Sequence, residues 1–339
     1  MTAVAARALA LPGVPRRVVE SGEPLHGRYA GRIDEIDWST LDGAYSRSCL
    51  WKRLHHKRWQ YVGIGSGEVY VGMAIVDLGW SVTAFAYVFD RLRKRVMADW
   101  AQDGLPGLSG GVSDQPVQGA EARFRGPGAT LSLRHEAGDI MSLKVKTPVM
   151  AMQVEMALGQ CAPFLLAVGP IDGGVVHATQ KSSALPVRGW VEVEDERWDL
   201  AQAVACLDSS NGLLARDTAW RWACAHSPEV GFNLQQGYFG GQENVLWLKG
   251  ELIPLGAAHF EFDAQQPLAP WHIRTDDGLL DLVFQPEGAR SDDRDMLIAA
   301  SHYVQPVGTF HGTVRRTQGS APVRVEGLLG VTEDHRSRW

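Results

Sequence analysis

Little in this sequence of 339 residues indicates helix. Apolar residues seldom recur with helical spacing, and no apolar run approaches the roughly 20 residues that span a bilayer. An integral membrane segment is therefore not expected. A short apolar run precedes the arginines at 16 and 17, whereas a signal peptide places its basic residues first. We therefore expect a cytoplasmic protein.

Cysteine is also sparse, and the spacing of the cysteines argues against a CxxC motif and a disulfide framework. The four cysteines form no CxxC motif, and the chain is too long to need a disulfide framework. Cys206 and Cys224 lie in apolar surroundings and are expected to be reduced core residues. The histidines are scattered, and "GIGSG" (63–67) lacks the spacing of a dinucleotide motif. We expect no metal and no cofactor.

The charge is modest and excludes another class of partner. A net charge of -6 argues against nucleic-acid binding, and 45% hydrophobic residues allow a sizeable core. Two basic runs, 52–58 and 91–95, are consistent with transient contact with an anionic membrane surface. Solvated loops or strand ends explain them as well, and we favour that interpretation. The oligomeric state is left open.

Short runs of β-branched and aromatic residues, bounded by turn residues, predict an all-β fold. The predicted strands are 58–65, 68–79, 81–90, 122–126, 129–136, 139–147, 187–195, 231–239, 244–255, 258–264, 271–287, 308–316 and 323–335. Turn chemistry predicts hairpins with Gly138-Asp139 at one tip. A seam near 181–189 divides the chain into domains 1–185 and 186–339, each about the length of a lipocalin barrel. Helical character is expected at 198–208, with a loop as the alternative, and 103–122 is expected to be a long loop.

The segment 208–222, "DSSNGLLARDTAWRW", is the most informative stretch. Alternation along a strand places Trp220 and Trp222 on one face, where they line a pocket or fill an ordinary core. Asp208 is either a functional acid or a turn or cap residue before "SSNG".

In their order along the chain, several segments resemble a bacterial family catalogued as a domain of unknown function. These are 27–34, 57–64, 177–189, 208–222, 231–252 and 308–339. That family is distantly similar to the lipocalin-like carotenoid 1,2-hydratases (hydroxyneurosporene synthases), with tocopherol cyclase a remoter cousin. Asp208 matches the acid of that group, and Trp220-Arg221-Trp222 matches its tryptophan strand. "NVLWLKGELI" matches the following hairpin, with Lys249-Gly250 at the turn.

The resemblance implies two lipocalin-like (calycin-type) antiparallel β-barrels that enclose an apolar cavity. One departure concerns the segment after the acid. The relatives often have a Trp-Gly pair there, whereas this sequence has Ser209, Ser210, Asn211 and Gly212.

Protonation of an alkene requires a carboxylic acid beside an apolar slot, and burial against indoles raises the pKa of such an acid. We take Asp208, Glu243 and Lys181 as catalytic candidates. The substrate-binding candidates are Trp220, Trp222, Arg216, Asn233, Asn244 and Tyr238. A cation near Asp208, such as Arg216 or Arg221, opposes the acid role, since it favours the carboxylate. Asn233, Glu243 and Asn244 are explained as well by roles in holding turns, and Lys181 by a position on the surface; for these four residues we favour the structural interpretation.

The favoured function is a redox-neutral acid–base enzyme: a hydratase or dehydratase, an isomerase or a cyclase. Its substrate is a hydrophobic isoprenoid-, polyketide- or lipid-like molecule. A lipid or pigment carrier is the alternative, and it predicts an apolar cavity without a perturbed acid. A glycan-binding β-protein is a third possibility, and it predicts an open groove lined by tryptophans.

Overall fold

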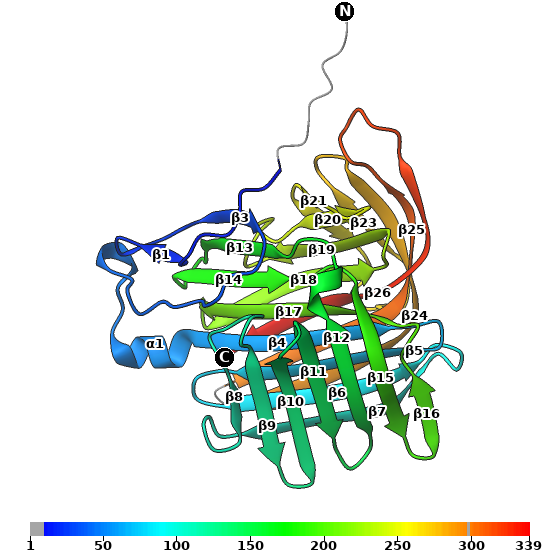
Figure 1. Cartoon of the computed structure of the whole chain (residues 1–339), viewed down its shortest axis with the longest axis horizontal. Coiled ribbons are helices and arrows are strands. Elements are labelled where there is room, and N and C mark those ends of the chain that lie inside the picture. Colours follow the sequence, from blue (N-terminus) through cyan, green and yellow to red (C-terminus); the bar gives the residue numbers. More distant parts are fainter. Residues whose placement is uncertain (1–9, 297–298) are drawn as a thin grey trace, which may run out of the picture.

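The structure, a computed structural model, describes residues 10–296 and 299–339 and consists mainly of antiparallel strands (Figure 1). Its one α-helix within these residues, α1, spans Cys49–His55, and the Ser48 hydroxyl caps it by accepting the Trp51 backbone N–H at 3.2 Å. None of the helices in the described part is both long and apolar enough to cross a membrane. The prediction of an all-β chain is confirmed.

The strands form a small hairpin and two large sheets. The hairpin pairs β1 (Val19–Glu20) with β2 (Glu23–Pro24). The first sheet contains β3 (Gly27–Ala30), β4 (His56–Gly65), β5 (Val69–Asp77), β6 (Val82–Asp90), β7 (Arg95–Gly104), β8 (Gly110–Val112), β9 (Glu121–Gly126), β10 (Ala129–Glu136), β11 (Ile140–Lys146), β12 (Ala151–Ala157), β13 (Leu165–Pro170), β14 (Val176–Lys181), β15 (Leu185–Val193), β16 (Glu196–Asp199) and β17 (Val204–Leu213). The second contains β18 (Asp217–His226), β19 (Val230–Gly237), β20 (Val245–Leu248), β21 (Glu251–Pro254), β22 (Ala258–Glu261), β23 (Trp271–Thr275), β24 (Leu280–Met296), β25 (Ala299–Val314) and β26 (Val323–Arg338). Single 3-10 turns occur at Gly43–Tyr45 and Leu158–Gln160.

Local turn chemistry explains why several predicted hairpins form. Lys249 and Gly250 join β20 to β21 with φ values of 51° and 82°. Two successive residues with positive φ form a turn whose twist matches that of the flanking strands. Asp139, with φ 58°, and Gly138, with φ 78°, lie at the tip between β10 and β11. Both predicted hairpins are therefore present.

The first sheet divides at β17. One edge of β17 pairs with β4 along its whole length, whereas the other edge pairs with β15 at residues 204–205 and with β14 at residues 208–213. The branch that runs from β15 to β8 folds back over β4–β6, so that the first sheet encloses a core of its own (Figure 1). Its core includes Ile64, Met73, Leu133 and Leu143.

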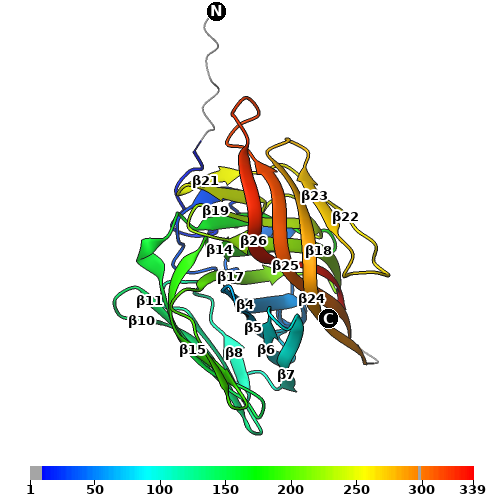
Figure 2. The same cartoon turned by 90° about the vertical axis from the view of Figure 1, so that its right-hand side faces the viewer.

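The second sheet curls until β22 approaches β19 (Figure 2). Phe232, Trp271, Phe284 and Phe310 fill it. Strands β18, β25 and β26 also contribute to an interface with β4–β6 and β17, because a separate cluster joins Tyr61, Tyr87, Trp222 and Val307. The interface between the two sheets is thus a third core layer, and the candidate site lies within it.

One expectation needs correction. Residues 198–208 form no helix, since β16 ends at Asp199 and β17 begins at Val204. β17 has pairing partners on both edges, and this pairing favours the extended conformation over a helix. The expected seam at 181–189 includes the short passage from β14 to β15 within the first sheet, and the division into domains at this point stays a prediction. The two sheets divide later, between Leu213 and Asp217.

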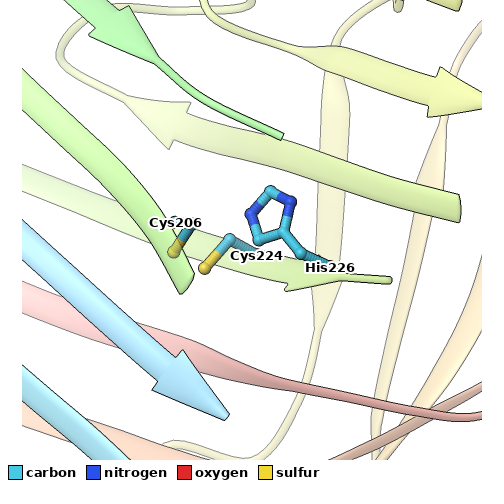
Figure 3. Close-up of side chains that lie close together, drawn as sticks. All are labelled: Cys206, Cys224 and His226. Atoms are coloured by element: carbon cyan, nitrogen blue, oxygen red, sulfur yellow. The ribbon is translucent and has the colours of Figure 1, made fainter. Parts of the chain in front are cut away.

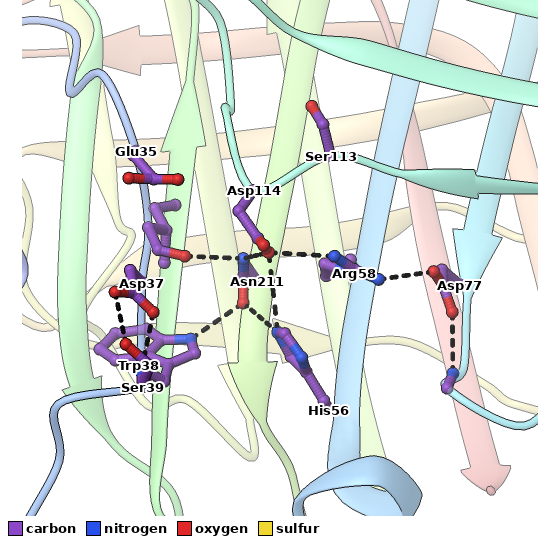
Figure 4. Close-up of polar contacts among 12 residues, drawn as sticks. Glu35, Asp37, Trp38, Ser39, His56, Arg58, Asp77, Ser113, Asp114 and Asn211 are labelled. Carbon is purple, nitrogen blue, oxygen red and sulfur yellow. Dashed lines mark hydrogen bonds and ion pairs between the residues drawn. The ribbon is translucent and has the colours of Figure 1, made fainter. Parts of the chain in front are cut away.

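An N-terminal segment is anchored on β17 by a buried polar network (Figure 4). The Trp38 indole N–H donates to Asn211 Oδ1 at 2.9 Å, and Asn211 Nδ2 donates to Asp114 at 2.9 Å. Arg58 then bridges Asp114 and Asp77 at 3.1 and 2.8 Å. The groups of this network satisfy one another, which is the behaviour of a structural network.

Candidate functional site between the two sheets

The candidate site is a cavity of about 110 Å³ within the interface between the sheets. Its apolar lining consists of Trp59, Tyr61, Ala74, Val76, Phe85, Trp220, Trp222, Tyr238, Tyr303 and Trp339. Its polar lining consists of Lys181, Asp208, Gln235, Glu243, Glu333 and His335. The resemblance implied a cavity enclosed by the barrels; this one lies between the two sheets, and both contribute to it.

Lys181 and Asp208 face each other across neighbouring strands. They are paired residues of β14 and β17, so their side chains emerge on the same face of the sheet. The Lys181 ammonium forms an ion pair with Asp208 Oδ2, and the Lys181 side chain is only 4% exposed. Thr179 and Ser210, the next pair on that face, place their hydroxyls 3.4 Å from Asp208 Oδ1.

Glu243 approaches the same ammonium from the second sheet. It lies between β19 and β20, and its Oε2 is 3.1 Å from Lys181 Nζ. Burial raises the pKa of Glu243; Lys181 opposes this shift, and the nearby Asp208 carboxylate adds to it. Burial alone would lower the pKa of Lys181, but the two carboxyl groups outweigh burial and raise it. The cavity therefore holds a charged ammonium and a carboxyl that retains its proton more strongly than usual.

Aromatic rings surround these charges. Trp220 and Trp222 alternate along β18, and both line the cavity. The Trp222 indole N–H donates to Asn233 Oδ1 at 2.8 Å, and that of Trp220 donates to Glu333 Oε1 at 2.8 Å. Burial, followed by the Glu243 and Asp208 carboxyls, raises the pKa of Tyr238 well above its ordinary value. Tyr238 is thus a hydrogen-bond donor that does not ionise at neutral pH.

Gln235 is a residue of the cavity wall whose side-chain amide has neither of its polar atoms paired in the described part of the chain. Its side chain is buried, yet neither Nε2 nor Oε1 has a hydrogen-bond partner among the described residues. A buried amide without partners costs about 1–3 kcal/mol, so such groups in native structures generally await a water or a ligand. Gln235 can therefore pair with a polar atom of a water or of another molecule in the cavity.

A second chamber adjoins the first and extends its apolar space. It has a volume of about 270 Å³ and shares Val76, Phe85, Tyr303, His335 and Trp339 with the first. Arg290, which lies over the rings of Phe85 and Tyr303 at 4.5 and 5.2 Å, belongs to its wall. Together the chambers reach the lower end of the about 300–1,000 Å³ typical of small-molecule sites.

The structure brings six of the nine predicted site residues to the cavity wall: Asp208, Glu243, Lys181, Trp220, Trp222 and Tyr238. Asn233 lies behind the wall and donates to the Glu243 carbonyl at 3.0 Å. Asn244 is buried and holds the turn by donating to the Gly256 carbonyl at 2.9 Å. Arg216 is exposed, and Arg221 lies 3.6 Å from Asp334, so the cation beside Asp208 is Lys181 and neither arginine.

Sequence reasoning missed Gln235, Tyr61, Tyr303 and the chamber beside them. Glu333 and His335, from β26, also line the cavity. For Gln235 a signal existed, since Asn233 and Gln235 place amides at alternate positions of an otherwise apolar strand. Tyr61 and Tyr303 belong to distant strands that meet only in the folded molecule, so nothing local singles them out.

Fold and site together define an all-β protein that has, between its two sheets, a cavity lined by aromatic and ionisable side chains. The chain belongs to the family described as a domain of unknown function (DUF2804), whose model matches residues 18–339. No curated protein matches its sequence.

Solved structures of similar fold include kievitone hydratase from Nectria haematococca. It is 11% identical, with a TM-score of 0.54 over 86% of this chain and 93% of that one. CghA in complex with Sch210972 is also 11% identical, with a TM-score of 0.54 over 97% of this chain and 98% of that one. At this identity, the likenesses show a shared fold.

Proposed function

We propose that the protein is a redox-neutral acid–base enzyme, of the hydratase, dehydratase, isomerase or cyclase type, that acts on a hydrophobic isoprenoid-, polyketide- or lipid-like substrate. One observation carries the proposal: Glu243, whose pKa is raised by burial, and the Lys181–Asp208 ion pair share a cavity lined by tryptophans. One solved structure of the same fold is a hydratase, which agrees with this chemistry.

Two carboxyl groups with different environments support acid and base roles. The ion pair with Lys181 makes Asp208 the anionic partner, so the acid role expected for Asp208 passes to Glu243. In the hydration direction, Glu243 gives its proton to an alkene carbon, water adds to the cationic centre, and Asp208 takes the proton that this water loses. The alkene gains one proton and one hydroxyl group, and no electrons are exchanged. The cycle closes when Asp208 releases its proton to solvent and Glu243 takes one up.

The remaining residues of the wall bind and orient the substrate. The π faces of Trp220 and Trp222 stabilise a cationic centre. The unpaired amide of Gln235 accepts or donates a hydrogen bond to an oxygen of the substrate. Because Lys181 contacts both carboxyl groups, it holds them in position.

Solvent deuterium tests the proposal across a whole mixture of candidate substrates at once. The purified protein is incubated in deuterium oxide with a lipid extract of the producing cells, and the extract is searched by mass spectrometry for deuterated products. Wild-type protein is expected to generate at least one labelled product, and Glu243→Gln and Asp208→Asn proteins none. Equal labelling by wild type and variants contradicts the proposal.

A lipid or pigment carrier is the second candidate, and the adjoining apolar chamber favours it. A carrier binds the fluorescent polyene cis-parinaric acid equally well with and without Asp208→Asn, and it introduces no deuterium. Sugar stacking in an open groove is less well supported, since Trp222 is only 6% exposed.

A further inference from the structure

A second, larger cavity of about 520 Å³ lies in the same interface, farther along the strands that line the candidate site. Cys206 precedes Asp208 by two residues on β17, and Cys224 follows Trp222 by two residues on β18. Side chains two residues apart on a strand share a face, so both thiols point into the interface. His226, again two residues farther, belongs to the same wall.

These three residues bring their donor atoms together (Figure 3). The sulfurs of Cys206 and Cys224 and a ring nitrogen of His226 all lie within 4.8 Å of one another. Tetrahedral zinc with bonds of about 2.3 Å to sulfur and about 2.0–2.1 Å to nitrogen requires separations of about 3.5–3.8 Å. The donor atoms therefore need to move toward one another by about an ångström to reach the separations of tetrahedral zinc. Thiolate sulfur and imidazole nitrogen are ligands that zinc prefers.

Glycines make room for this cluster. A Cβ at Gly63 would lie 3.2 Å from Cys206 Sγ, and one at Gly231 would lie 2.8 Å from His226 Nδ1. The Nδ1 atom is shielded from solvent and has no hydrogen-bond partner within the described residues. A disulfide between the two free cysteines would use the sulfurs alone and leave the imidazole without a role.

We propose that Cys206, Cys224 and His226 bind one Zn²⁺ ion whose fourth coordination position faces the 520 Å³ cavity. The ion joins the two sheets, because Cys206 belongs to the first and Cys224 and His226 to the second. Three protein ligands with an open fourth position leave room for water or an anionic oxygen ligand. The site is separate from the Lys181, Asp208 and Glu243 cluster, so it does not depend on the proposed acid–base activity.

The test uses the full chain, reduced, stripped of metal by a chelator and then dialysed against Zn²⁺ or Co²⁺ without oxygen. Elemental analysis is expected to find one Zn²⁺ per chain. Cobalt is expected to show thiolate-to-metal charge-transfer absorption. His226→Gln should weaken zinc binding by more than about 100-fold, since even changes around a metal's ligands cost about 10–100-fold. Cys49→Ser, which alters an exposed thiol elsewhere, should bind as wild type does.

Zinc that binds only the folded state raises its melting temperature, so Zn²⁺ should stabilise wild type but not Cys224→Ser protein. If Cys224→Ser does not fold, the cobalt spectrum of wild type still decides. Reduced wild-type protein that retains no stoichiometric zinc overturns the proposal. So does cobalt binding without thiolate bands, or isolation of the metal-free chain with a Cys206–Cys224 disulfide.

Discussion

Lys181 and Asp208 lie opposite each other on β14 and β17 and form an ion pair buried between the two sheets. Glu243, from the second sheet, approaches the same ammonium at 3.1 Å. One positive charge does not neutralise two buried carboxylates, so one carboxyl group holds a proton more readily. Burial raises the pKa of Glu243, which makes Glu243 that group.

Replacement of the shared cation tests its structural role. Lys181→Met should lower the free energy of unfolding by about 3–5 kcal/mol, because it leaves Asp208 charged and unpaired in a buried place. Urea denaturation measures the loss. The double variant Lys181→Met with Asp208→Asn should recover part of it, since the stranded charge is gone. Equal stability of the single and double variants would show that Asp208 does not depend on Lys181.

Substitution of the proposed acid should change the pH dependence. Because the folded-state pKa of Glu243 is raised, its carboxyl is protonated below that pKa and loses the proton as pH rises through it. Turnover by wild type should therefore decrease as the pH rises through the pKa of Glu243, because the acid form is lost. Glu243→Gln should abolish most of the activity, and the remaining activity should no longer show this decrease with pH. The pKa of Lys181 is itself raised, so its titration lies at still higher pH.

Removal of the proposed base should spare the fold. Asp208→Asn is expected to reduce turnover by about 10²–10⁴-fold, the usual contribution of a positioned proton-transfer group. The asparagine preserves the shape and keeps an amide oxygen beside Lys181 in place of the carboxylate oxygen. Circular dichroism checks the fold, and Asp217→Asn, on an exposed residue of β18, is the matched control. Unchanged turnover in Asp208→Asn protein would remove Asp208 from the mechanism.

Gln235 should affect stability and binding in opposite directions. Gln235→Leu removes a buried amide without partners and should raise the free energy of unfolding of the ligand-free protein by about 1–3 kcal/mol. The same change should weaken binding of oxygen-containing ligands, since their hydrogen bond is lost. Thermal unfolding and a binding titration measure the two effects. A variant that is less stable and binds normally would indicate a purely structural glutamine.

Much of the strand pattern was accessible from the sequence, because hairpins depend on local chemistry. Lys249-Gly250 lies at the turn between β20 and β21, and Trp220 and Trp222 share the face that alternation predicts. These features depend on residues within a few positions of one another.

The environment of Asp208 was not accessible, because its partners are distant in sequence. The composition "DSSNG" is typical of a turn, yet it forms the middle of β17. Gln60 donates to Ser209 from 149 residues away, and Trp38 donates to Asn211 from 173 residues away. Such long-range partners allow a polar segment to be buried in a sheet. Local sequence propensities cannot predict such partners, because these partners are far away along the chain.

The central claim is that the buried Glu243 carboxyl, beside the Lys181 ammonium, keeps its proton to higher pH than an ordinary glutamate does. Infrared difference spectroscopy of wild type minus Glu243→Gln protein tests it most directly. The account predicts that the carbonyl stretch of one protonated carboxylic acid persists to higher pH than that of a free glutamate, shifts in deuterium oxide and is absent from the variant. A difference spectrum that shows only carboxylate bands would contradict it.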